Sequence, residues 1–105
     1  MLQKIDFRPG EVIYNDFNID PEITFEEQRY SFNEDLFQVE YAGRYVIDIG
    51  WYPAHKKNGN FQVRIVKNCD WENLIYLKKA KTFDHLYLLV EECTTIIKDL
   101  LENEA

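Results

Sequence analysis

The residues best suited to chemistry gather in one acidic stretch, DPEITFEEQRYSFNED, which spans residues 20–35. It holds six carboxylates and a single base, Arg29, with four apolar or aromatic residues spaced between them. Glycosidase-type catalysis needs two carboxylates held a few ångströms apart in different environments. Glu26 and Glu27 are adjacent, so they point in different directions in either a helix or a strand. The stretch therefore favours a solvated face or a surface for a basic partner over a catalytic pair.

Asp48 is the other carboxylate of interest, because it interrupts an otherwise apolar strand pattern, RYVIDIGWY. A buried or partner-facing carboxylate there would have a shifted pKa and could act in catalysis. The usual alternation of inward and outward residues instead favours a place on the solvated side of the sheet, with Val46, Gly50 and Tyr52. We predict the solvated position.

Cysteine and histidine offer little further chemistry. Cys69 and Cys93 form no CxxC pair and no ligand cluster with His55 and His85, and no phosphate-binding, hydrolase or EF-hand motif is present. Cys93 falls on the apolar stripe of a predicted helix, where a small core residue is expected. His55 lies in a lysine-rich turn and His85 in a first helical turn, so both are expected at the surface. We predict no metal site, no cofactor and no enzymatic activity.

The charge of the chain is uneven. Its net charge is −7, and residues 1–50 contain eleven acids and four bases, whereas residues 51–105 contain eight of each. Such a field repels nucleic acid and anionic membranes, since both are bound through Lys and Arg. It accelerates the approach of a basic protein. The N-terminal residues, MLQKIDFRPG, contain no apolar run typical of a signal peptide, so we expect a cytoplasmic protein with reduced thiols.

The elements that must position these residues follow from local patterns. Apolar residues at three- and four-residue spacing predict a helix over residues 83–102, capped by Thr82. Alternation and turn signals predict strands over residues 36–41, 44–52, 61–67 and 74–77. Residues 12–17 fit a strand or an irregular edge, and residues 24–31 a short helix or turn. We predict one α+β domain, residues 1–105, with an antiparallel meander sheet of about four strands and a C-terminal helix packed on one face.

Trp51 lies near the end of one predicted strand, and Trp71 follows another. A tryptophan in such a place is usually a lid on the core, but an exposed one is a natural anchor at a protein interface. Trp51 and Trp71 are therefore candidates for either role.

The runs NEDLFQVEY, YVIDIGWYP and NGNFQVRIVKNCDWENLIYL, followed by a terminal helix, resemble a small bacterial immunity protein of contact-dependent growth inhibition and related polymorphic toxin systems. The resemblance covers residues 33–102 and is one of layout, with no diagnostic motif. It implies a cytosolic, non-enzymatic inhibitor of the C-terminal toxin domain of a large exoprotein, and many such toxins are nucleases with basic clefts.

On this hypothesis, the acidic side chains would face Lys and Arg of the toxin, and aromatic residues would supply apolar anchors. The acids are Glu22, Glu26, Glu27, Glu34 and Asp35, and the anchors are Tyr30, Trp51 or Trp71. Three alternatives stay open: an adaptor or regulator with a basic cellular partner, a small hydrolase that uses Asp48 or Cys69, and an acidic face that serves only solvation.

Overall fold

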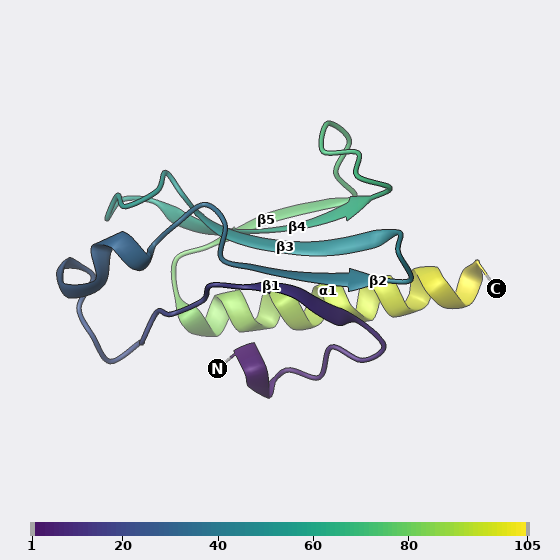
Figure 1. The fold of residues 1–105 in the computed structure, drawn as a ribbon, viewed down its shortest axis with the longest axis horizontal. Helices are drawn as coiled ribbons and strands as arrows, with labels where there is room; N and C mark the ends of the chain where they lie inside the picture. Colours follow the sequence, from purple (N-terminus) through teal and green to yellow (C-terminus); the bar gives the residue numbers. More distant parts are fainter. Residues whose placement is uncertain (1, 105) are drawn as a thin grey trace.

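A computed structural model describes residues 2–104 of the chain, apart from the side chain of Gln3. Its central element is a five-stranded antiparallel sheet, against which one long helix packs (Figure 1). The strands are β1 (Glu11–Asn15), β2 (Phe37–Tyr41), β3 (Tyr45–Tyr52), β4 (Asn60–Lys67) and β5 (Tyr76–Ala80), and the helix is α1 (Phe83–Asn103). Two short 3-10 helices, η1 (Leu2–Lys4) and η2 (Glu26–Ser31), precede β1 and β2. The predicted α+β class is confirmed, with five strands instead of about four.

The sheet is a meander, because its spatial order β1-β2-β3-β4-β5 is also the chain order. A tight turn joins β2 to β3, and in it Ala42 and Gly43 have positive φ angles of 54° and 65°. Tyr41 pairs with Tyr45, so the loop has three residues, and the two left-handed conformations allow the chain to reverse direction within it. β3 and β4 pair over their whole length, from Tyr45 opposite Lys67 to Tyr52 opposite Asn60. These two strands therefore form the centre of the sheet.

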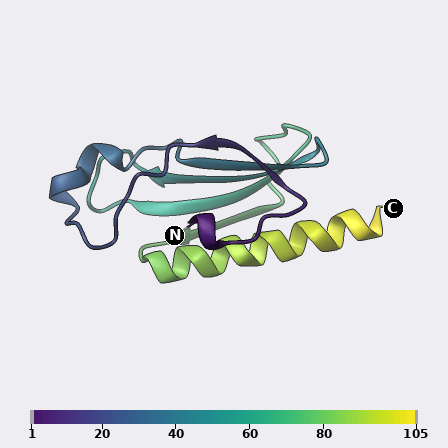
Figure 2. The same ribbon diagram turned by 60° about the horizontal axis from the view of Figure 1, so that its bottom comes forward.

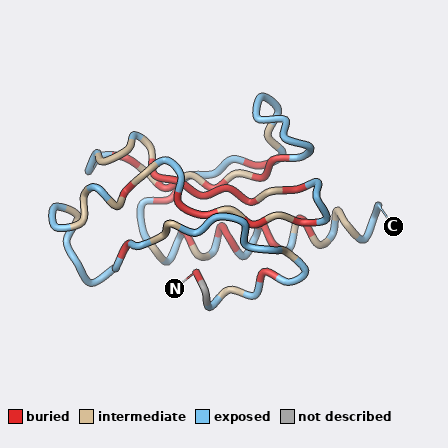
Figure 3. Tube along the Cα trace, viewed as in Figure 1, coloured by how far each residue is buried: buried red, intermediate tan, exposed pale blue. Residues whose placement is uncertain are grey.

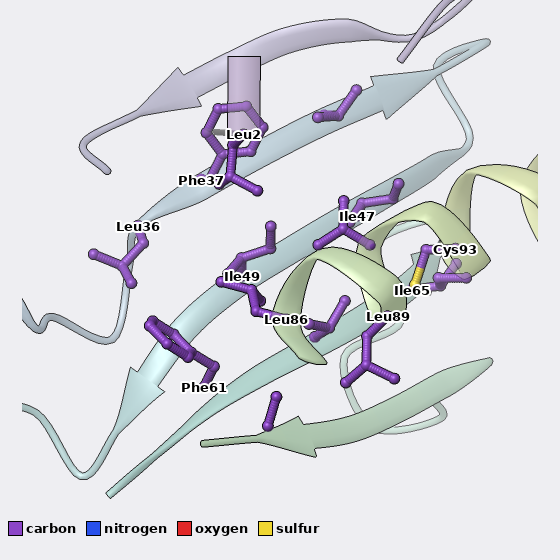
Figure 4. Close-up of a cluster of buried hydrophobic side chains, with 14 of the residues drawn as sticks. Leu2, Leu36, Phe37, Ile47, Ile49, Phe61, Ile65, Leu86, Leu89 and Cys93 are labelled. Carbon is purple, nitrogen blue, oxygen red and sulfur yellow. The ribbon is translucent and has the colours of Figure 1, made fainter. Parts of the chain in front are cut away.

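The core lies between the sheet and α1, which runs along one face of it (Figure 2). Alternate residues of β3 point to that face, and Ile47 and Ile49 are fully buried there. They meet the predicted stripe of α1, in which Leu86, Cys93 and Ile97 are also fully buried (Figure 4). Burial of each such aliphatic side chain contributes about 1.5–3 kcal/mol. Figure 3 shows the result: buried residues follow the central strands and one side of the helix.

The ends of α1 are held by polar contacts. The Oγ1 of Thr82 accepts a hydrogen bond from the backbone N–H of His85 at 3.1 Å, which is the predicted N-cap. At the other end, the carboxylate of Glu104 accepts a hydrogen bond from the Tyr45 hydroxyl and lies 2.6 Å from Arg44 and 3.6 Å from Lys67. These contacts join the end of the helix to the β2–β3 turn and to β4. None of the described helices is both long enough and apolar enough to cross a membrane.

The two edge strands compare differently with the prediction. Residues 12–17, which fitted a strand or an irregular edge, contribute the edge strand β1, with a bulge between Val12 and Tyr14, so the strand alternative is confirmed. The last strand is Tyr76–Ala80 instead of residues 74–77, because its buried residues are Tyr76 and Ala80 and the intervening Leu77 faces solvent. An apolar run on an edge strand is a poor guide to its boundaries, since only one of its faces meets the core.

Candidate functional site

The acidic stretch lies in the connection between β1 and β2, which we call the acidic arm and define as residues 16–36. It extends past one end of the sheet and carries η2 near its tip (Figure 1). Three of its apolar residues are buried, Ile19 at 3% exposure, Phe32 at 5% and Leu36 at 0%. The Phe25 ring lies 4.7 Å from the Phe32 ring. The arm is therefore attached to the core by the apolar residues that interrupt its acids.

Gln28 holds the tip of the arm in shape. Its Oε1 accepts a hydrogen bond from the N–H of Asp20 at 3.0 Å, and its Nε2 donates to the carbonyls of Asp20 (2.8 Å) and Ile23 (2.9 Å). Asp20 in turn accepts from the N–H of Glu22 at 2.9 Å. One amide side chain thus closes the loop of residues 20–28 through hydrogen bonds to the backbone.

The second part of the arm runs beside β3 at Gly50. The N–H of Leu36 donates to the carbonyl of Ile49 and the N–H of Trp51 to the carbonyl of Asn33, at 3.0 and 2.8 Å. Glu34 and Asp35 lie between these two bonds and bulge over the sheet, so that a Cβ on Gly50 would lie 1.9 Å from the Glu34 carbonyl oxygen. Glycine is required here by the close approach of two backbones. The bulge presents both carboxylates to solvent.

Most carboxylates of the arm have no basic partner. Glu22, Glu27, Glu34 and Asp35 are exposed and form no ion pair within residues 2–104. Glu26 differs, because Lys57 lies 3.1 Å from it and lowers the pKa of its carboxyl group.

The one base of the arm, Arg29, is turned away from these acids. Its guanidinium donates to the carbonyl of His55 at 3.4 Å and stands over the Phe25 ring. Arg29 therefore does not neutralise the unpaired acids of the arm.

A polar hollow of about 320 Å³ lies where the bulge meets β1 and the β3–β4 connection. It is lined by Tyr14, Asp16, Asn33, Glu34, Asp35, Ala54 and His55. His55 is half-buried, not at the surface as predicted, because its Nε2 lies 2.8 Å from Asn33 Oδ1. No pattern in the sequence pointed to this hollow, since its residues come from three separate segments.

The predicted aromatic anchors have different surroundings. Tyr30 is 76% exposed and touches the edge of the His55 ring, beside the arm. Trp51 is only 5% exposed and its Nε1 donates to the carbonyl of Lys56 at 2.8 Å, so it is a lid on the core and offers little surface to a partner. Trp71 is 48% exposed, but it lies in the β4–β5 loop at the opposite end of the sheet from η2 (Figure 1). Only Tyr30 is brought together with the acids.

Asp48 is buried, at 2% exposure, and the prediction of a solvated position is wrong. Its cross-strand neighbours are Gln38 and Arg64, on a face of the sheet where Val66 is also buried. The Nε2 of Gln38 donates to the Asp48 carboxylate at 2.9 Å. Burial raises the pKa of Asp48, and the Gln38 hydrogen bond and the Arg64 charge oppose that effect.

The cysteines and His85 lie apart from this region. Cys93 is fully buried in the core, and burial raises the pKa of its thiol to about 12, which keeps it protonated at neutral pH. Cys69 is exposed in the β4–β5 loop, and His85 is exposed on α1. The described residues contain no group of three or more His, Cys, Asp or Glu with the arrangement of a metal site.

Comparison of the chain with protein-family models, with curated proteins and with solved structures finds no match.

Proposed function

We propose that this protein is an immunity protein, which binds and neutralises a cognate toxin domain through the acidic arm. The observation that carries the proposal is the set of unpaired carboxylates on an ordered arm: Glu22, Glu27, Glu34 and Asp35 are exposed and without a basic partner in the described chain. An ordered set of charges loses less entropy on binding than a mobile one. Such a surface suits a partner with a basic cleft, and a nuclease has one.

The mechanism is steric and electrostatic occlusion. The bulge at Glu34 and Asp35 and the tip at Glu22 and Glu27 face the Lys and Arg residues that the toxin uses for its substrate. Tyr30 supplies the apolar contact, since it is highly exposed and already rests on the His55 ring. The protein acts in the cytoplasm, where a toxin would meet its target, and needs no cofactor.

The partner can be identified by affinity capture of the tagged protein from the cells that encode it, with washes at low and then high salt. We expect one basic toxin domain that is released as the salt concentration rises. Expression of that domain alone should then arrest growth, and co-expression with this protein should restore it. Recovery of an abundant housekeeping protein that is harmless when expressed would instead favour the adaptor.

The role of the arm can be tested on the purified pair with a triple variant, Glu22→Gln, Glu27→Gln and Glu34→Gln. Glu26 is left unchanged because Lys57 already neutralises it. Three exposed charge contacts of about 0.2–1 kcal/mol each give roughly a tenfold loss of association rate at low salt, which high salt should remove.

The matched control neutralises three exposed acids of α1, with Glu91→Gln, Asp99→Asn and Glu102→Gln, and changes the net charge equally. We expect this control to lower the association rate much less than the arm variant does. Equal effects of the two variants would show that only total charge matters and that the arm has no special part in binding.

A further inference from the structure

A second hollow, of about 200 Å³, opens on the other side of the arm, where residues 23–32 approach the end of the sheet and the start of α1. We call it the aromatic hollow. Its apolar wall consists of Ile23 and five rings, those of Phe25, Phe32, Trp51, Phe61 and Phe83. None of the carboxylates assigned above to toxin binding lines it, so the site is separate from the proposed function.

The rings of the wall form a continuous arc. Ring centroids are 4.7 Å apart between Phe25 and Phe32, 6.2 Å between Phe32 and Phe61, and 5.5 Å between Phe61 and Phe83. Trp51 also lines the hollow and meets Phe32 and Phe61 edge-on, with ring centroids 4.8 and 4.9 Å apart. Aromatic pairs favour these distances and tilted or edge contacts.

The arc is incomplete at its ends. Phe32, Trp51 and Phe61 are buried, whereas Phe25 and Phe83 are only half-buried and keep ring surface open to the hollow. A further ring in the hollow would cover that surface. A cavity of about 150 Å³ is enough to hold benzene, so a hollow of this size suits one ring with a small substituent.

The polar groups of the hollow specify the charge of that substituent. Lys57 and Lys81 line it, and Lys57 is already paired with Glu26 at 3.1 Å. Lys81 is exposed and forms no ion pair with any described residue. Gln28 also lines the hollow, but its amide is engaged by the backbone of the arm. The available polar group is thus a cation, which calls for an anionic ligand.

We propose that the aromatic hollow binds a small arylcarboxylate, meaning one aromatic ring that carries a carboxylate on a short linker. The ring packs against Phe25 and Phe83, and the carboxylate pairs with Lys81. Because the hollow is small and its rim is exposed, we expect a dissociation constant on the order of 1 mM for a single-ring ligand.

Trp51 provides the readout, since it stands in the wall of the hollow. In a full-length Trp71→Phe variant it is the only tryptophan. This variant is titrated with phenylacetate and, as a neutral analogue of the same shape, with phenylacetamide, and Trp51 fluorescence and backbone amide chemical shifts are followed. We expect a saturable change for phenylacetate, centred on residues 23–32 and 81–83, and binding of phenylacetamide that is weaker by about two- to fivefold.

The charge contact is tested with Lys81→Gln, and the matched control is Lys79→Gln, an exposed lysine of β5 that does not line the hollow. Lys81→Gln should weaken the binding of phenylacetate by about two- to fivefold and leave the binding of phenylacetamide unchanged. Lys79→Gln should affect neither ligand. The proposal is overturned by a change that does not saturate, by equal affinity for the two ligands, or by equal effects of the two lysine substitutions.

Discussion

Replacement of Gly50 by alanine tests whether the position of the acidic bulge is set by the close contact between β3 and the arm. The added Cβ would lie 1.9 Å from the carbonyl oxygen of Glu34, which is backbone and not the end of a flexible side chain. Non-bonded atoms rest about 3.5 Å apart, so the carbonyl must withdraw by roughly 1.5 Å. Such a shift pulls on the two hydrogen bonds that flank the bulge, from Leu36 to Ile49 and from Trp51 to Asn33.

The expected cost follows from these contacts. Each of the two backbone hydrogen bonds contributes about 0.5–1.5 kcal/mol, and overpacking in a well-packed site costs about 1–3 kcal/mol. We therefore expect Gly50→Ala to lower the free energy of unfolding by about 2–6 kcal/mol. For a domain of this size, that corresponds to a decrease in Tm of at least about 8 °C.

Urea unfolding followed by tryptophan fluorescence measures the change, and amide exchange at Leu36 and Trp51 reports whether the two bonds open. Gly43→Ala is the matched control, because Gly43 has a φ of +65° but no atom within 4 Å of an added Cβ. The left-handed conformation alone should cost about 1–2 kcal/mol. If Gly50→Ala is no more destabilising than Gly43→Ala, and both amides stay protected, the contact does not hold the bulge in place.

Two further predictions concern buried groups. Because burial raises the pKa of Asp48, its ionisation opposes folding: stability should fall as pH rises from the unfolded pKa of about 3.9 through the folded value, by about 1.4 kcal/mol for each unit of the shift. Asp48→Asn does not titrate at this position. In urea titrations, its free energy of unfolding minus that of the wild type should therefore increase as the pH rises from about 3.5 to about 7. If the two proteins show parallel pH profiles, the pKa of Asp48 is not raised. Of the two cysteines, exposed Cys69 should react with a thiol reagent in the native protein, whereas buried Cys93 should react only after unfolding. Rapid modification of both in native buffer, counted by mass spectrometry, would show that the core opens at Cys93.

The arm illustrates how a charged segment is kept in one shape. Its acids would repel one another in a free loop, and such runs are commonly disordered. Here Ile19 and Phe32 are buried and Gln28 makes three hydrogen bonds to the backbone. These contacts, which do not involve the carboxylates, offset the conformational entropy that the arm loses when it is ordered. The charges are left for a partner.

Much of the fold could be predicted because its signals are local. The period of three to four residues in α1 and the cap at Thr82 depend only on near neighbours, and the predicted helix over residues 83–102 matches Phe83–Asn103. The three central strands were likewise within one residue of their predicted bounds, since alternation and the turn at Ala42 and Gly43 are also short-range features. The acidity of residues 20–35 and the apolar residues within it could be read directly from the sequence.

The tertiary structure alone decided what these elements cover and which side chains meet. Asp48 is buried because Gln38 and Arg64 come from neighbouring strands, and Trp51 closes the core because Phe32 and Phe61 meet it from segments distant in the chain. The two hollows combine residues from several segments in the same way. Local patterns determine the elements because the hydrogen bonds of α1 join near neighbours and the alternation of a strand repeats every two residues. Burial and charge pairing instead depend on contacts between residues far apart, which no local pattern encodes.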